Sequence, residues 1–124
     1  MSFVIDTDIF IDNLRGHDKA AEFIRNSLKE ETHFSAITET ELLAGKECSD
    51  QKKKENVLHM LALFDKIVVD NQIAQLAGDI RREYQTAIPD AIIAATAIST
   101  NSVLITRNTK DFEKIDGLQV KSPY

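Results

Sequence analysis

Short runs of aliphatic and β-branched residues alternate along this chain with longer segments whose apolar residues recur at helical spacing. The short runs are typical of buried strands, and the longer segments indicate amphipathic helices. The clearest helical stripe, at i, i+3, i+4, i+7 and i+11, is formed by Ile73, Leu76, Ala77, Ile80 and Tyr84. Strands that alternate with helices predict an α/β fold: a three-layer α/β/α sandwich around a mostly parallel sheet of four to five strands.

Turn and capping residues place the boundaries of these elements. We expect Asp8 to be the N-cap of a helix over residues 9–14, with Gly16 ending it, and Thr38 to open the helix after the second strand. The predicted strands are residues 2–5, 33–37, 67–69, 103–106 and 118–121. The other predicted helices are residues 18–29, 38–47, 57–64, a segment around residues 73–84, 90–99 and 109–112.

The length of 124 residues suits one domain, residues 1–124. A single cysteine, Cys48, excludes an internal disulfide, and no apolar run approaches the ~20 residues that a membrane helix needs. Aspartate at position 6 argues against a signal peptide, so we expect a cytoplasmic protein with no membrane association. The net charge of −5 disfavours nucleic-acid binding by bulk electrostatics, but an acidic site that recruits divalent cations remains compatible with a nuclease.

Acidic residues lie at the ends of the predicted elements. Asp6 directly follows the first strand, and Glu41 lies one turn into the helix after the second strand. Asp90 begins the helix that precedes the fourth strand, and Asp111 lies in the first turn after that strand. In open α/β sheets, sites form beyond the carboxyl ends of the strands. A parallel sheet would therefore bring these four side chains to one edge.

Such a group of carboxylates has a definite chemistry. Several carboxylates within a few ångströms cannot all stay ionised unless a cation compensates them. Ligands that are all oxygen suit Mg²⁺ or Mn²⁺ rather than zinc. One or two such ions can activate a water and stabilise the leaving oxygen of a phosphodiester. This is a nuclease mechanism that needs no histidine, serine or cysteine.

Each acidic residue also fits a structural role. Thr38 and Glu41 match a capping box, and Asp90 suits the positive end of a helix dipole. Turn or first-turn roles are equally open for Asp6, Asn108 and Asp111. Spacing alone does not choose between the two readings.

Four segments together resemble the motifs of the PIN-domain family, specifically the VapC-like toxins of type II toxin–antitoxin systems. They are VIDTDIFIDNLRG (residues 4–16), SAITETELLAG (35–45), IPDAIIAATAIS (88–99) and VLITRNTKDFEKIDGLQV (103–120). The resemblance covers nearly the whole chain, with the motifs in the family's order. It implies a PIN-like fold and a Mg²⁺- or Mn²⁺-dependent endoribonuclease, with an RNA substrate, a cognate antitoxin and a homodimer as partners.

The resemblance also assigns residues. Asp6, Glu41 and Asp90 match the three core metal-site acids of the family. The fourth acid stands at one of two positions, which hold Asn108 and Asp111 here. We favour Asp111, with Asn108 as a polar neighbour, and this departure leaves open whether a second metal binds.

Polar and basic residues flank these motifs. Thr7 and Thr106 match positions beside the site, where a hydroxyl can hold a water or phosphate, or only satisfy backbone groups. Arg15, Arg107 and Lys110 are the candidate RNA contacts, because they follow the motifs that frame the site. The lysine run at 52–54 and the three histidines are interpreted as surface or packing residues.

Three other interpretations stay open at this point. A receiver domain of a signalling system would use Asp70, after residues 67–69, as its phosphate acceptor. A phosphatase would use Asp6 and Asp8, although that two-residue motif is weak alone. A catalytically inactive PIN fold would serve only as a binding module. For the ribonuclease interpretation, the RNA target is also open.

Overall fold

The computed structural model of the protein describes residues 1–124 and contains one five-stranded sheet. The strands run in the order β3-β2-β1-β4-β5, and every neighbouring pair is parallel. Their bounds are β1 Ser2–Ile5, β2 Glu31–Ser35, β3 Asp65–Ile67, β4 Val103–Ile105 and β5 Gln119–Lys121.

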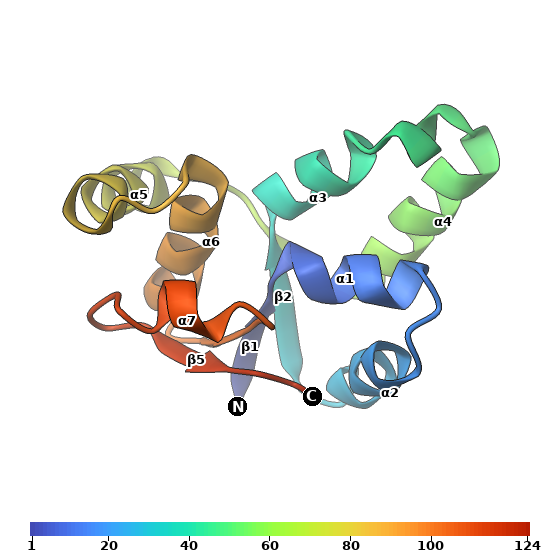
Figure 1. Ribbon diagram of the computed structural model, residues 1–124, viewed down its shortest axis with the longest axis horizontal. Helices are drawn as coiled ribbons and strands as arrows, with labels where there is room; N and C mark the ends of the chain where they lie inside the picture. Colours follow the sequence, from blue (N-terminus) through green and yellow to red (C-terminus); the bar gives the residue numbers. More distant parts are fainter.

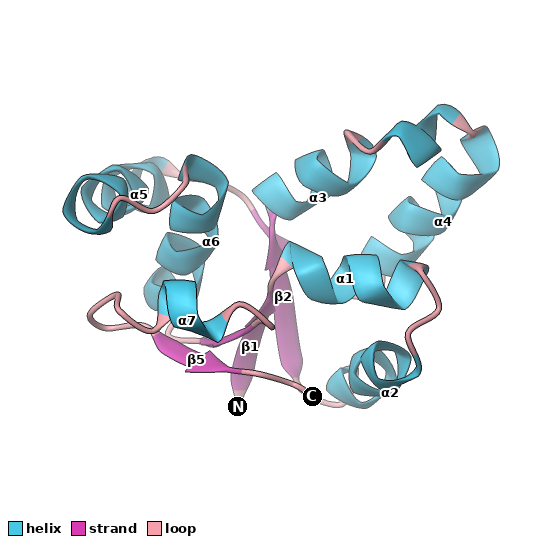
Figure 2. Cartoon of the chain, in the orientation of Figure 1, coloured by secondary structure: helices cyan, strands magenta, loops and turns pink.

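Helices cover both faces of this sheet. They are α1 Thr7–Leu14, α2 Asp18–Ser27, α3 Ala36–Leu43, the 3-10 helix η1 Lys46–Ser49, α4 Gln51–Leu61, α5 Asn71–Tyr84, α6 Ile88–Ser99 and α7 Thr109–Phe112. Helices α1, α2 and α4 lie on one side of the sheet and α5 and α6 on the other (Figure 1). The predicted three-layer sandwich is therefore confirmed, with all strands parallel (Figure 2). None of the helices has the length and apolar character needed to cross a bilayer.

Alternation along the central strands creates two separate cores. Val4 and Leu104 point to one face and pack with residues of α5 and α6, whereas Ile5 and Ile105 point to the other and pack with α1, α3 and α4. All four side chains are fully buried. Because successive strand residues face opposite sides, a central strand covered by helices on both faces buries side chains at consecutive positions.

The order in which strands are added to the sheet changes side at β1. From β1 the chain moves outward through β2 to β3, and it then returns to the opposite side of β1 to form β4 and β5. The carboxyl ends of β1 and β4 therefore flank a topological switch point, where open α/β sheets place their ligand sites.

The predicted starts of α1, α3 and α6 are each about two residues too late. Helix α1 begins at Thr7 with Asp6 as its N-cap, so Asp8 lies inside the first turn. Helix α3 begins at Ala36 with Ser35 as its N-cap, so Thr38 does not open it and no capping box forms with Glu41. For α1 and α3 the helix begins without a connecting loop: Asp6 directly follows β1, and Ser35 is the last residue of β2.

Two strands are also shifted by two residues. The second strand spans Glu31–Ser35 rather than residues 33–37. The third strand spans Asp65–Ile67 rather than residues 67–69, and Val68 and Val69 are exposed beyond it. Its pairing partner β2 ends at Ser35, which aligns with Ile67, so no backbone partner remains for the two valines. The helix predicted over residues 57–64 begins earlier, at Gln51 with Asp50 as its N-cap, and ends at Leu61.

Candidate active site at the carboxyl edge of the sheet

Asp6 lies at the switch point, directly after β1. Its backbone N–H donates to the carbonyl of Ile105 at 2.9 Å, which ties it to the end of β4. Its Oδ1 accepts from the N–H of Thr7 at 2.8 Å, and its Oδ2 accepts from the hydroxyl of Thr106 at 2.7 Å. The residue is only 6% exposed, so a charged group is held in the interior between two strand ends.

This burial has an electrostatic cost. The pKa of Asp6 is raised from 3.8 to about 7, mainly by desolvation and also by the charges of Asp8 and Asp90, against the lowering effect of the Thr106 and Thr7 hydrogen bonds. A buried carboxylate whose neighbours are also acidic favours either a proton or a metal cation.

Asp90 lies near enough to the other acids for their charges to affect its pKa. It lies in the first turn of α6, but the N-cap position is Ala87 and no side chain caps this helix. Burial raises the pKa of Asp90, and so do the charges of Glu41, Asp111 and Asp8. The structure therefore places the other three predicted acids and Asp8 within electrostatic range of Asp90, and we call Asp6, Asp8, Glu41, Asp90 and Asp111 the acidic cluster.

Glu41 approaches from α3 through a pair of threonines. The hydroxyl of Thr7 donates to Glu41 Oε1 at 2.7 Å and lies 2.9 Å from the hydroxyl of Thr38. Thr38 is fully buried. The predicted site-flanking threonine, Thr7, thus connects the start of α1 to α3, and Thr38 is a buried supporting residue that the capping-box interpretation had misplaced.

Asp8 is a member of the cluster that sequence reasoning missed. Its Oδ2 accepts from the N–H of Arg107 at 3.1 Å and from the hydroxyl of Thr106 at 3.4 Å, while its Oδ1 is buried without any hydrogen-bond partner. Burial raises the pKa of Asp8. The available signal was its spacing of two residues from Asp6, which was interpreted as a helix cap or a weak phosphatase motif.

The loop after β4 supplies the remaining polar groups. Thr106 is fully buried, donates to Asp6 and accepts from the N–H of Asn108 at 3.0 Å. Asn108 in turn donates from Nδ2 to Asp111 Oδ2 at 2.8 Å. The two alternative positions for the fourth acid are therefore direct hydrogen-bond partners, and Asn108 orients the carboxylate of Asp111.

The basic candidates are not equally placed. Arg107 pairs through Nε with Asp12 Oδ2 at 2.7 Å and follows Thr106 at the cluster. Lys110 is exposed on α7, two residues from Asn108. Arg15 lies at the other end of α1 and lines a groove, together with Lys53 of the lysine run.

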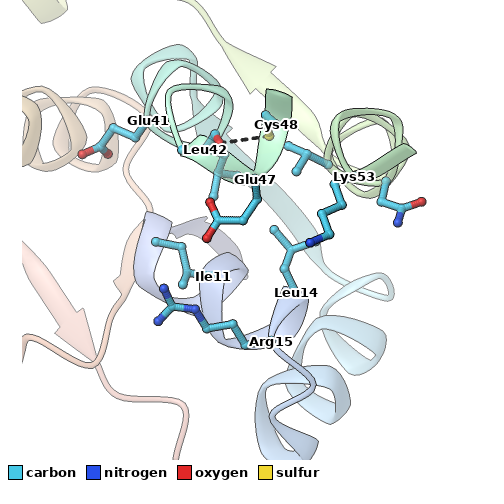
Figure 3. Close-up of a pocket in the computed structure, with 11 residues that line it drawn as sticks. Ile11, Leu14, Arg15, Glu41, Leu42, Glu47, Cys48 and Lys53 are labelled. Carbon is cyan, nitrogen blue, oxygen red and sulfur yellow. Dashed lines mark hydrogen bonds between the residues drawn. The ribbon is translucent and has the colours of Figure 1, made fainter. Parts of the chain in front are cut away.

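This groove runs between α1 on one side and α3, η1 and α4 on the other, with a volume of about 500 Å³ (Figure 3). Its lining is mixed: apolar side chains such as Ile11, Leu14 and Leu42 lie beside charged ones. Glu41, a member of the acidic cluster, also lines it. The groove and the acidic cluster therefore meet at this residue.

The donor chemistry of the cluster fits a hard divalent cation. All its side-chain donors are carboxylate oxygens, burial and mutual repulsion raise the pKa values of Asp6 and Asp90, and Asp8 Oδ1 has no partner. The side chains do not form a preformed ligand group, because no three of His, Cys, Asp or Glu are arranged so that they could hold a metal ion. A cation would thus have to draw the carboxylates together.

The comparisons with known proteins agree with this architecture. The model of the PIN domain family matches residues 3–118. Ribonuclease VapC19 of Mycobacterium tuberculosis is 35% identical over 94% of this chain and 96% of its own length. A chain of a toxin–antitoxin complex from Klebsiella pneumoniae is also 35% identical, with a TM-score of 0.81 over 98% of this chain and 97% of its own. A chain of DNA-bound VapBC from Salmonella typhimurium, 24% identical, shares the fold with a TM-score of 0.88 over 100% of this chain and 99% of its own.

Proposed function

This chain belongs to the PIN domain family, and from that premise we propose that it is an endoribonuclease, the toxin of a toxin–antitoxin pair, which uses Mg²⁺ or Mn²⁺ at the acidic cluster. The relatives named as a ribonuclease and as part of a toxin–antitoxin complex support the activity and the partner class. The observation that supports the site most directly is the electrostatic coupling of Asp90 to both Glu41 and Asp111, and of Asp6 to Asp90, at the switch point of the sheet.

We assign the metal to Asp6, Glu41 and Asp90, with Asp111 completing the site and Asp8 as an additional acid. A bound divalent ion would neutralise these carboxylates, contact the scissile phosphate and activate water for attack on phosphorus. The protein's own part is orientation. The Thr7 N–H and the Thr106 hydroxyl fix the two oxygens of Asp6, and the Thr7 hydroxyl fixes Oε1 of Glu41 and leaves its Oε2 available.

The test is cleavage of pooled cellular RNA by the wild type and by Asp90→Asn, with Mg²⁺, with Mn²⁺ and with a chelator. We expect cleavage by the wild type only, abolished by chelation. Asp79→Asn is a matched control, because Asp79 is an exposed acid on α5 and should leave cleavage unchanged. Full activity of Asp90→Asn would contradict the site. Absence of both cleavage and metal binding in the wild type would favour an inactive binding module.

The antitoxin partner is supported by the groove of Figure 3. An antitoxin segment with apolar side chains for Ile11, Leu14 and Leu42 would extend along the groove to Glu41, and a basic residue there could compensate the acidic cluster. Leu14→Arg should then weaken antitoxin binding while RNA cleavage by the free chain persists. Equal antitoxin affinity of this variant, measured by calorimetry with the purified partner, would contradict the location.

A homodimer is the remaining proposed assembly. It is supported by large apolar side chains that are exposed in the single chain, among them Val68 at 63% and Ile88 at 59%. The molar mass of the purified chain, measured by light scattering during gel filtration, distinguishes a dimer from a monomer of 13.9 kDa.

A further inference from the structure

Asp12 joins two residues that are far away in the sequence. Its Oδ2 accepts from the phenol of Tyr124 at 2.6 Å and pairs with Nε of Arg107 at 2.7 Å. Asp12 lies on α1, one helical turn after Asp8 of the acidic cluster. Its side chain is only 15% exposed, so this three-residue contact is partly screened from water.

Two carboxylates of α1 fix Arg107, one through its backbone and the other through its side chain. Its backbone N–H donates to Asp8 Oδ2, and its Nε pairs with Asp12 Oδ2. Its side chain is still 49% exposed, and no protein hydrogen bond or ion pair uses its two terminal nitrogens. The result is a guanidinium whose position is set while two of its nitrogens stay free beside the site.

Tyr124 is itself held in place. Its ring stacks on His17 with centroids 4.8 Å apart and an interplanar angle of 24°. His17 is in turn fixed as the N-cap of α2, where its Nδ1 accepts from the N–H of Ala20. Burial and the neighbouring Asp12 carboxylate raise the pKa of the Tyr124 phenol, so that it remains a donor to Asp12.

RNA that approaches the acidic cluster needs such a fixed cation. The chain has a net charge of −5, and the cluster repels phosphate wherever no metal screens it. A guanidinium with free terminal nitrogens matches the geometry of a phosphate, and preorganisation reduces the entropy that is lost on binding. Arg15 and Lys110 have no comparable contact with acids of α1.

We propose that Arg107 binds a backbone phosphate of the RNA beside the acidic cluster, and that Asp12 and Tyr124 are positioning residues that hold its guanidinium for this contact. The inference rests on the proposed ribonuclease function, because it names the group that receives the RNA. It requires that Tyr124, which does not touch the acidic cluster, acts on RNA binding only through Arg107.

The experiment is a double-mutant cycle on RNA binding. Fluorescence anisotropy of a labelled random-sequence single-stranded RNA measures affinity over a series of salt concentrations, with Mg²⁺ fixed. All variants carry Asp90→Asn so that the RNA stays intact. Tyr124→Phe removes one hydroxyl, Arg107→Ala removes the guanidinium, and the double variant combines them. Arg82→Ala is the matched control, because Arg82 is an exposed arginine paired with Asp79 on α5.

We expect Arg107→Ala to weaken binding roughly tenfold and to reduce the slope of log affinity against log salt by about one. Tyr124→Phe should weaken binding roughly threefold, and it should have no further effect when Arg107 is already alanine. Arg82→Ala should change neither quantity. Thermal unfolding of each variant verifies that the comparison is made between folded proteins.

The inference is overturned if Arg107→Ala leaves the salt slope unchanged, if Tyr124→Phe has the same effect in both backgrounds or none in either, or if no RNA binds. The failure of the proposed function is separable from these outcomes. If the wild type cleaves no RNA but the coupling is present, the phosphate contact stands and the nuclease assignment is wrong. If cleavage occurs without the coupling, only this inference is wrong.

Discussion

Asp6 has two roles that oppose each other. As the N-cap of α1 it joins the sheet to the first helix, and as a buried acid among other acids it destabilises the fold when it is ionised. Its pKa is about 7 in the folded chain and 3.8 when unfolded, so the folded state binds more protons between these values. Stability that depends on this group is therefore present below about pH 4 and is lost as the pH rises through 7.

The first prediction follows from this linkage. In the metal-free chain, Asp6→Asn should remove the penalty, so the variant should gain stability relative to wild type as the pH rises from 4 to 8. The gain should reach at most about 4 kcal/mol. Urea unfolding in EDTA across this pH range measures it, with Asp79→Asn as control. Parallel pH profiles for wild type and Asp6→Asn would contradict the raised pKa.

Thr106 tests the orientation of Asp6. Thr106→Val keeps the side-chain shape but removes the donor to Asp6 Oδ2, and we expect metal affinity and cleavage to fall roughly 10- to 100-fold. Thr96→Val is the matched control, because Thr96 is equally buried but donates within α6 to Ile92. Metal titration followed by calorimetry provides the measurement. Equal losses in the two variants would show a general packing effect instead.

At this scale the sequence was informative about residue types but not about long-range contacts. Asp6, Glu41, Asp90 and Asp111 were expected at one edge because parallel strands end there, and the other three do lie within electrostatic reach of Asp90. Asp8 was missed because its partners come from the loop after β4, nearly a hundred residues away. Such hydrogen bonds depend on the closed fold and leave no local pattern.

At the scale of elements, caps decided where the prediction was inaccurate. Apolar runs located every strand to within two residues, but the starts of α1 and α3 were placed too late. The reason is that the helix cap directly follows the strand at Asp6, and is the last strand residue at Ser35, so no connecting loop separates strand from helix. A pattern based on separate strand and helix segments has no place for a residue that does both.

The position of Asp70 argues against the interpretation of this chain as a receiver domain. A receiver needs an acceptor aspartate at the end of a middle strand, whereas β3 is an edge strand and Asp70 accepts from the N–H of Ile73 as the N-cap of α5. Asp70→Ala should lower the free energy of unfolding by about 1 kcal/mol and leave RNA cleavage unchanged. Denaturant unfolding and the pooled-RNA assay measure the two effects. Loss of cleavage without loss of stability would restore a chemical role for Asp70.

At the scale of the molecule, the parallel sheet explains why so much of the site could be anticipated. One strand order, with β1 between β2 and β4, brings the residues after β1, β2 and β4 to a single edge. What composition could not reveal is that the acids arrive there uncompensated by any lysine or arginine except Arg107 near Asp8. Electrostatic repulsion between carboxylates is therefore concentrated at the edge of the sheet where we propose that the metal binds.

The repulsion between the carboxylates of the acidic cluster predicts that metal binding and folding are linked. A cation that binds the folded acidic cluster, but not the unfolded chain, should raise the melting temperature in proportion to the logarithm of its concentration. Protons compete for the same carboxylates, and the Asp6 pKa of about 7 makes this competition strong below pH 7, with the raised pKa of Asp90 acting in the same direction. Mn²⁺ should therefore stabilise the wild type more at pH 8 than at pH 5. Asp90→Asn should respond weakly at both pH values, and NaCl at matched ionic strength should not reproduce the effect. Calorimetric melting curves at the two pH values test this linkage, and a metal-induced shift of equal size at pH 5 and pH 8 would place the binding ion away from the acidic cluster.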